Sequence, residues 1–192
     1  MKNRLVQDSH LQACLEDLPE NRNVLFVPTA AQNTALVAGP WASKGSYFLH
    51  AVARMNAALN ASDGDCLAAA LWHQGESDRP KFAAYEGAWT EIVTTLRDSN
   101  PAAENVPVVL GELTPYVTEN GPGYWKPIND VLRGIPDNHP FTALAPSHGL
   151  ESNEGGDNIH LSAACQRRYA ERYYASLNAV IYNVDEYNRH IN

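Results

Sequence analysis

The sequence is short of cysteine and lacks any regular cysteine spacing. Its three cysteines, Cys14, Cys66 and Cys165, are odd in number and far apart, so they do not form a disulfide framework. Apolar neighbours surround Cys14 and Cys66, and this pattern predicts small buried side chains at both positions. Cys165 lies at the start of an alanine-rich helical stretch, where nothing indicates a reactive thiol.

Clusters of basic residues and long apolar runs are also missing. The 14 lysines and arginines are outnumbered by 22 acidic residues, which gives a net charge of −8 at pH 7. This balance argues against nucleic acid or an anionic membrane surface as the main partner, and it favours a neutral or cationic substrate. No apolar window is long enough to span a membrane, and residues 1–8 lack the apolar core of a signal peptide. As written, the chain is predicted to be cytoplasmic.

What the sequence does contain is a globular composition that suits a single domain, residues 1–192. Hydrophobic residues make up 44% and charged residues 19%, which is typical of a chain with a packed core. Apolar runs predict four buried strands, at residues 24–28, 66–71, 106–111 and 141–146. Helical spacing predicts helices at residues 9–18, 46–60, 80–98, 124–132 and 161–177, before a polar tail at 183–192. This alternation predicts an α/β fold with a mostly parallel sheet and helices on both faces.

The most informative segment is the heptad Trp-His-Gln-Gly-Glu-Ser-Asp at residues 72–78, directly after an apolar run. Ligands bind beyond the carboxyl ends of the strands in open α/β sheets. An imidazole, an amide and a carboxylate arrive together at such an end, from His73, Gln74 and Glu76. Core packing does not require this combination, so the heptad predicts a functional site. The alternative is a loop whose polar groups only satisfy the backbone.

Three further polar clusters follow predicted strands or precede the last helix. Asp157 and His160 have the Asp-x-x-His spacing of a general base oriented by an acid, or of a turn residue followed by an incidental histidine. The Gln-Asn-Thr triplet at residues 32–34 offers oxyanion donors, or forms an ordinary Asx-turn. Glu112 either binds a substrate hydroxyl or, as we favour, braces the loop at residues 72–78.

Taken in order along the chain, these clusters resemble the SGNH hydrolases, and more specifically the sialate O-acetylesterase-like carbohydrate esterases. The motifs are Ala-Gln-Asn-Thr, the Trp-His-Gln-Gly-Glu-Ser-Asp heptad, Gly-Glu-Leu, and Asp-x-x-His before a final helix. The resemblance extends from about Ser9 to Tyr174, and His-Gln-Gly-Glu is its most specific part. It implies a flavodoxin-like three-layer α/β/α fold and the removal of O-acetyl groups from sugars. We expect no cofactor and no metal.

The resemblance also implies roles for individual residues. His160 is expected to be the general base and Asp157 the acid that orients it. Gln74 occupies the position of an oxyanion-hole amide, and Gly75 and Asn33 are expected beside it. The family usually has glycine where Asn33 stands. Because asparagine tolerates a left-handed backbone better than most residues, we expect the turn to survive this change.

Supporting roles are expected for His73, Glu76 and Glu112. Glu76 is expected to hold the loop or the ring of His73, although a direct catalytic role is a second possibility. Three tryptophans are candidates for stacking on a sugar ring: Trp41, Trp72 and Trp125. Trp72 suits the core equally well.

The nucleophile is the main departure from the family. Its members begin with a strand that ends in Gly-Gln-Ser-Asn or Gly-Asp-Ser, and this first strand is missing here. Ser9 is the nearest substitute, but it follows a short charged segment and serves better as a helix cap. Three explanations remain open: a fragment of a longer product, a strand and serine from another chain or segment, or a reduced domain without catalysis. The first two are favoured.

Two other functions compete with a serine acetylesterase. The missing serine favours a non-catalytic carbohydrate-binding or assembly module. A metal hydrolase would use His73, Glu76, Asp157 and His160, but their spacing is not that of a strong metal site.

Overall fold

The computed structural model describes residues 24–61, 66–116, 124–153 and 155–191. Three parallel strands form one sheet in the order β1-β2-β3. They are β1 (Ala70–Trp72), β2 (Val108–Gly111) and β3 (Thr142–Ala145). In the register, Ala70 lies opposite Val108, which in turn lies opposite Thr142. The helices are α2 (Ser46–Leu59), η1 (Glu76–Ala84), α3 (Tyr85–Asp98), η2 (Pro101–Ala103), α4 (Lys126–Asn138) and α5 (Ala163–Ile191).

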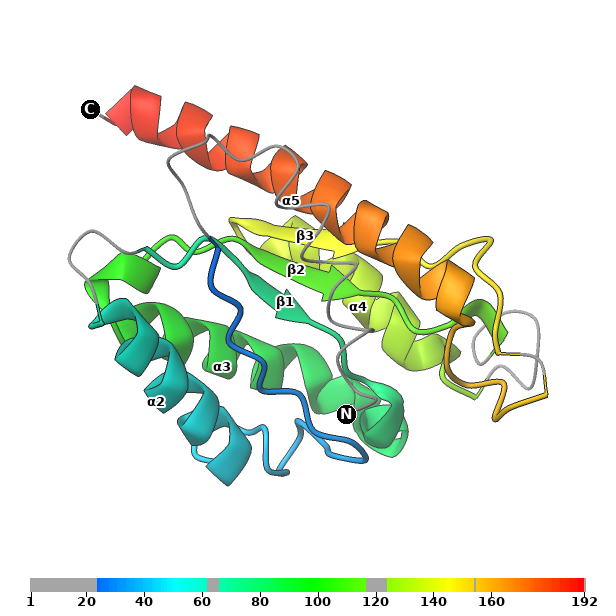
Figure 1. Ribbon diagram of the computed structural model, residues 1–192. Coiled ribbons are helices and arrows are strands. Elements are labelled where there is room, and N and C mark those ends of the chain that lie inside the picture. Colours follow the sequence, from blue (N-terminus) through cyan, green and yellow to red (C-terminus); the bar gives the residue numbers. More distant parts are fainter. Residues whose placement is uncertain (1–23, 62–65, 117–123, 154, 192) are drawn as a thin grey trace.

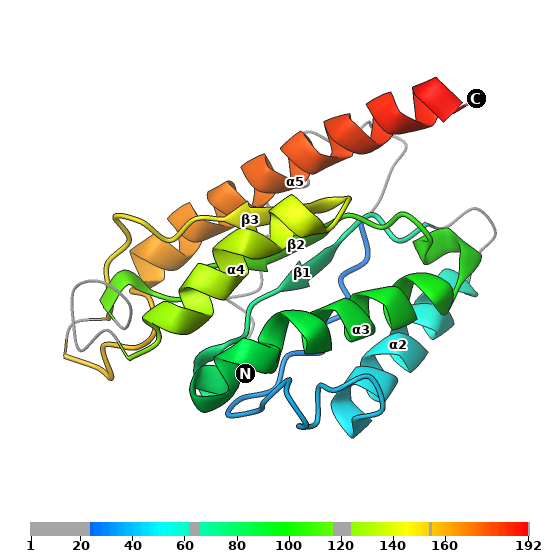
Figure 2. The ribbon, with the colours of Figure 1, turned by 180° about the vertical axis from the view of Figure 1, so that it is seen from behind.

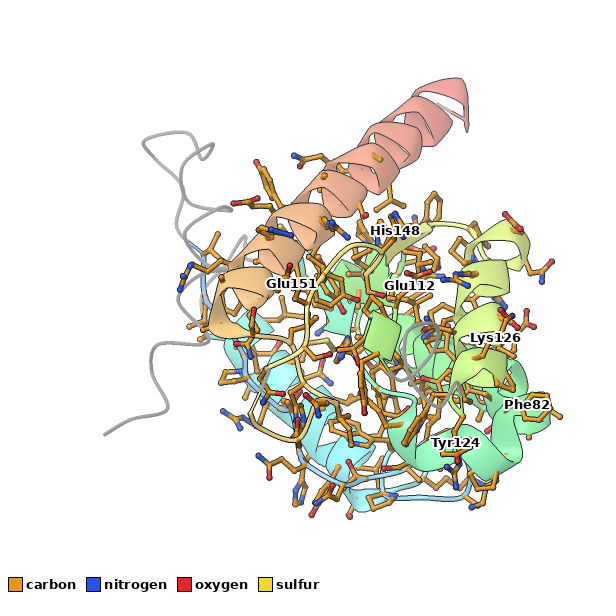
Figure 3. All side chains as sticks on the ribbon, turned by 90° about the vertical axis from the view of Figure 1, so that its right-hand side faces the viewer. Phe82, Glu112, Tyr124, Lys126, His148 and Glu151 are labelled. Atoms are coloured by element: carbon orange, nitrogen blue, oxygen red, sulfur yellow. The ribbon has the colours of Figure 1, made fainter. Side chains whose placement is uncertain are left out.

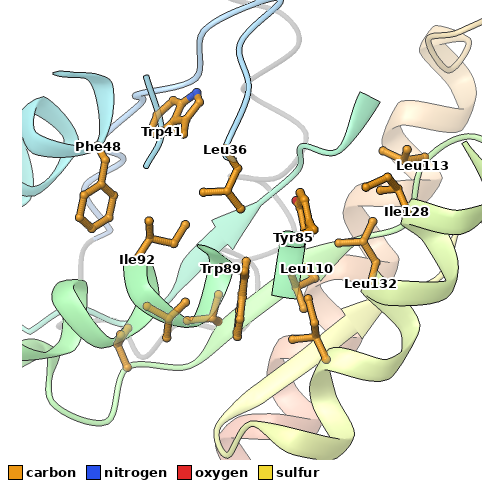
Figure 4. Close-up of a cluster of buried hydrophobic side chains, with 14 residues drawn as sticks. Leu36, Trp41, Phe48, Tyr85, Trp89, Ile92, Leu110, Leu113, Ile128 and Leu132 are labelled. Atoms are coloured by element: carbon orange, nitrogen blue, oxygen red, sulfur yellow. The ribbon is translucent and has the colours of Figure 1, made fainter. Parts of the chain in front are cut away.

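Helices cover both faces of the sheet and make three layers (Figures 1 and 2). Because successive side chains of a strand point to opposite faces, Val108 and Leu110 join one core and Val109 joins the other. The first core contains residues of α2, α3 and α4 (Figure 4), whereas the second lies under α5. The predicted parallel α/β/α architecture is confirmed.

Helix α3 shows how the sequence pattern produces the first core. Tyr85, Trp89, Ile92 and Val93 have helical spacing, and all four are at most 6% exposed. The helix was expected to begin at residue 80, with Phe82 on the same buried side. Instead, residues before Tyr85 form a 3₁₀ helix that contains a non-helical residue, Lys81 (φ −121°). This break rotates Phe82 away from the α3 stripe, and 42% of its surface is exposed.

The segment at residues 24–28 is not the buried strand that its apolar run predicts. It runs beside β1 in both ribbon views, but Leu25 is 72% exposed. A strand needs a hydrogen-bonded neighbour, and among the described residues β1 pairs only with β2.

Strand β1 begins at Ala70, later than the predicted residue 66, and Cys66 is exposed, contrary to expectation. Cys165 is buried, and Cys14 lies outside the described residues.

The last helix extends beyond residue 177, where it was predicted to end. Helix α5 continues to Ile191, so residues of the expected polar tail are helical. No glycine or proline follows Leu177, and the usual signals that end a helix are therefore absent from this stretch. Among the described residues, none of the helices is both long and apolar enough to cross a membrane.

Candidate active site

The carboxyl ends of the strands bring the predicted clusters to one side of the sheet. The heptad follows β1 and Glu112 follows β2, while the loop carrying Asp157 and His160 follows β3. Figure 3 views the molecule from this side, with Glu112 near the centre. Thr114 links two of these segments, because its hydroxyl donates to the carbonyl of Ile159 (2.7 Å).

Asp78, the last residue of the heptad, is the centre of a buried hydrogen-bond network. Its carboxylate is fully buried and accepts hydrogen bonds from the backbone N–H groups of Leu36 (2.7 Å) and Val37 (2.9 Å). Gln74 Nε2 donates to the same carboxylate (2.6 Å). These three donors satisfy a charge that would otherwise be costly to bury. The network fixes the loop segment at residues 34–37 to the end of β1. The sequence pattern did not predict this role of Asp78, although its i,i+4 spacing from Gln74 in the heptad is a signal for it.

The side-chain amide of Gln74 belongs to the same hydrogen-bond network. Its Nε2 donates to the carbonyl of Thr34 (3.1 Å) as well as to Asp78, and both amide hydrogens are therefore engaged. Its Oε1 lies 2.9 Å from the hydroxyl of Tyr85, which also contacts the Gln74 carbonyl at 2.8 Å. Burial raises the pKa of Tyr85 far above its usual value, so this hydroxyl stays neutral. For Gln74 to donate to an oxyanion, one of its present bonds has to break.

Asn33 adopts the left-handed backbone that was expected of it. Its φ is 55°, and it lies in a turn closed by the Thr34 hydroxyl, which donates to the Ala31 carbonyl (2.9 Å). Trp41 Nε1 donates to that hydroxyl (2.8 Å). The turn that was expected to survive with asparagine at this position is therefore present.

Gly75 is required by close packing. A Cβ atom placed on it would lie 2.7 Å from Ile128 Cγ2, so the loop after β1 approaches α4 too closely for a side chain.

The imidazole of His73 lies between a carboxylate and a tyrosine hydroxyl. Its Nε2 is 3.9 Å from Glu76 Oε1, and its Nδ1 is 3.3 Å from the hydroxyl of Tyr173. Glu76 therefore faces the ring that it was expected to hold.

Glu112 braces the structure, but through contacts other than the expected ones. Its carboxylate is buried and accepts from Arg133 Nε (2.5 Å) on one oxygen. The other oxygen accepts from the backbone N–H of Ser147 (2.8 Å). Glu112 thus joins α4 to the segment after β3, whereas we expected it to brace residues 72–78.

Asp157 and His160 form a hydrogen-bonded pair. One Asp157 oxygen accepts from the backbone N–H groups of Ile159 and His160, both at 3.0 Å, and the other oxygen bonds His160 Nδ1. The His160 backbone N–H, followed by its side chain, lowers the pKa of Asp157 to about 2. The carboxylate is therefore ionised at neutral pH and holds the imidazole by Nδ1, which leaves Nε2 for proton transfer.

Three other expected features concern the nucleophile, a metal site and the tryptophans. No serine of the described residues is hydrogen-bonded to His160, and Ser9 lies outside that part of the chain. The described residues contain no group of three or more His, Cys, Asp or Glu side chains that could hold a metal ion. Two of the three candidate tryptophans pack together: Trp41 is 6% exposed, and its ring centroid is 5.5 Å from that of Trp72.

Comparison with known proteins identifies the family to which the chain belongs. The family described as "Carbohydrate esterase, sialic acid-specific acetylesterase" matches residues 9–179. A solved protein from Arabidopsis thaliana is similar in structure, with a TM-score of 0.72 and 21% identity over 88% of this chain and 67% of that one. The structure of NanS is also similar, with a TM-score of 0.68 and 17% identity over 93% of this chain and 70% of the other. No curated protein sequence matches significantly. At these identities the two structures show the fold.

Proposed function

The chain belongs to the sialic acid-specific acetylesterase family of carbohydrate esterases, and from this premise we propose that it removes O-acetyl groups from a sugar by serine catalysis. The Asp157–His160 pair carries the proposal. An ionised carboxylate bonded to Nδ1 of a histidine is the arrangement that activates a serine hydroxyl. The pair lies on the side of the sheet where the strands end, which is where ligands bind in this fold class.

In the proposed reaction, His160 Nε2 takes the proton of the serine hydroxyl as its oxygen attacks the acetyl carbonyl. Asp157 stabilises the imidazolium that forms. The tetrahedral intermediate then collapses, and His160 returns the proton to the sugar oxygen as the ester bond breaks. Water, activated by the same imidazole, hydrolyses the acetyl-enzyme and releases acetate. The turn at Asn33 and the amide of Gln74 are the candidate oxyanion donors, and losing one such donor typically costs about 10²–10³ in kcat.

We propose that the nucleophile arrives on a strand that pairs with β1 and completes the sheet, from another segment or another chain. Among the described residues, β1 is hydrogen-bonded on one side only. Leu71 on β1 is 42% exposed, and Leu25 in the neighbouring segment is 72% exposed. A strand between them would cover both leucines and would deliver its carboxyl end beside the heptad.

The test measures acetate release and serine labelling together. The chain is assayed with para-nitrophenyl acetate, an O-acetylated sugar and a fluorophosphonate probe, both alone and joined to an upstream Ser-bearing segment if its gene encodes one. We expect hydrolysis and stoichiometric labelling when the serine is present, and loss of hydrolysis in His160→Asn. The proposal is wrong if the completed protein releases no acetate, or if release does not depend on His160.

A non-catalytic carbohydrate-binding module is the second candidate. It is favoured by the absence of a serine bonded to His160 within the described residues, and by the engagement of both Gln74 amide hydrogens. Such a module would bind glycans without probe labelling. Stoichiometric labelling of this chain alone would exclude it and would identify the serine by peptide mapping.

A further inference from the structure

The loop at residues 155–160, which carries the candidate catalytic pair, is held by a neighbouring residue, Asn153. The side-chain oxygen Oδ1 of Asn153 accepts a hydrogen bond from the backbone N–H of Asn158 (3.1 Å). The Asn153 backbone adds two bonds to the same loop: its N–H donates to the His160 carbonyl (2.9 Å), and its carbonyl accepts from the Gly156 N–H (2.9 Å). A single residue thus contacts the loop at three separate positions.

The side-chain bond acts on the peptide that joins Asp157 to Asn158. Asn158 has a left-handed backbone, with a φ of 58°, and this conformation is unfavourable for most residues other than glycine. The bond to Asn153 fixes the N–H of Asn158, and therefore the direction in which the chain leaves Asp157. This direction determines whether the Asp157 carboxylate reaches both the backbone N–H and Nδ1 of His160, as it does here.

The catalytic pair itself is too exposed for packing to fix it. The side chains of Asp157 and His160 are 45% and 72% exposed, so their geometry depends on the backbone of the loop. Asn153, by contrast, is confined: a Cβ atom at Gly156 would lie 2.5 Å from Asn153 Nδ2 and 2.9 Å from its Cγ. The close approach at Gly156 keeps the Asn153 amide in the place from which it reaches Asn158.

We propose that Asn153 is a positioning residue for the general base. Through Oδ1 it fixes the loop so that Asp157 bonds Nδ1 of His160, and Nε2 is left to accept the serine proton. The inference rests on the proposed function, because it adds a residue to the same reaction. A neutral imidazole that carries its proton on Nε2 cannot act as this base, so loss of the geometry acts on kcat through the tautomer.

The test measures the tautomer of the neutral His160 ring by ¹⁵N NMR of the full chain, with His160→Asn used to assign the signals. The unmodified chain should show the Nδ1–H form, because Asp157 accepts a hydrogen bond from that nitrogen. Asn153→Ala should shift the ring toward the Nε2–H form. It should also raise the pKa of Asp157, which is about 2, by about one pH unit, because weaker hydrogen bonds stabilise the carboxylate less.

Two further variants separate positioning from a general loss of stability. Asn153→Asp keeps an acceptor oxygen at the same place and should keep the Nδ1–H form. Asn100→Ala is the matched control, because it removes the same kind of bond, from the Ala102 N–H to Asn100 Oδ1 (2.9 Å), in the segment that precedes β2. It should change neither the tautomer nor the pKa of Asp157. The proposal is overturned by an Nε2–H ring in the unmodified chain, by an unchanged tautomer in Asn153→Ala, or by its equal loss in Asn100→Ala or Asn153→Asp.

Kinetics of the completed protein distinguish this inference from the proposed function. Asn153→Ala should lower kcat about tenfold and leave KM within about twofold of its value, since Asn153 orients the base and not the substrate. The NMR measurements need neither a nucleophile nor an ester. A correctly held tautomer without acetate release would contradict the proposed function alone. Acetate release whose kcat is unchanged in Asn153→Ala would contradict the positioning role alone.

Discussion

Replacing Asp78 tests whether the buried network holds the candidate site together. In Asp78→Asn, one carboxylate oxygen becomes an NH₂ group that faces either Val37 or the pair Leu36 and Gln74. The orientation toward Val37 is less costly, because it removes one hydrogen bond instead of two. Each hydrogen bond to a charged group is worth about 1.5–3 kcal/mol, and the two remaining bonds also lose the benefit of the charge. We expect Asp78→Asn to lower the free energy of unfolding by about 3 kcal/mol.

The measurement is urea denaturation, with hydrogen exchange at the two amides as a local readout. Exchange at Leu36 and Val37 should accelerate more than exchange in β2, because among the described residues only these two backbone amides donate to the Asp78 carboxylate. Asp130→Asn is the matched control: Asp130 pairs with Lys126 at the surface, so its change should stay within about 1 kcal/mol of zero. An unfolding free energy for Asp78→Asn within about 0.5 kcal/mol of the unmodified chain would refute the reasoning.

Three further outcomes follow from single contacts. Glu112→Gln should destabilise the fold by about 2 kcal/mol in urea denaturation, because it weakens a buried carboxylate's bonds to Arg133 and to the segment after β3; an unchanged midpoint would contradict this. The Asp157 carboxyl should titrate near pH 2 by ¹³C NMR, and its stabilising contribution should be present above the unfolded pKa of 3.8 and lost as the pH falls through about 2. A midpoint near 3.8 would show that the pair does not form. Gly75→Ala should cost about 1–3 kcal/mol, and Ile128→Leu should recover part of it, because leucine lacks the γ2 methyl group that the new Cβ would meet; additive effects of the two changes would argue against the clash.

The candidate site was partly readable from residue spacing. Asp157 and His160 are three positions apart, so a local loop is enough to join them, and this pair was predicted. The left-handed turn at Asn33 was predicted for the same reason, since it depends on the conformational preference of one residue. The role of Glu112 was only half predicted: a brace was expected, but its partners, Arg133 and Ser147, are 21 and 35 residues away.

The wrong predictions of burial share a cause. Whether an apolar side chain is buried depends on the segments that pack against it, and the local sequence does not specify these segments. The apolar run at residues 24–28 has the composition of a core strand, yet no strand pairs with it among the described residues, and Leu25 is exposed. Phe82 fits a helical stripe with Tyr85, but a single non-helical residue at Lys81 takes it off that face. Side-chain periodicity predicts which face of a helix is apolar. It does not predict whether the helix continues through every residue of the pattern.

The sequence by itself determined the alternation of strands and helices, the parallel α/β class, and the Asp-x-x-His pair, because each depends on composition or on spacings of a few residues. Only the tertiary structure decided how Asp78 is used and where Arg79 lies. The bonds from Leu36 and Val37 to Asp78 cross 42 and 41 residues, and the rings of Tyr124 and Trp125 reach Arg79 from a different loop. Such contacts form only when the chain has packed around the end of β1, since the packing and not the local pattern selects the partners of a polar group.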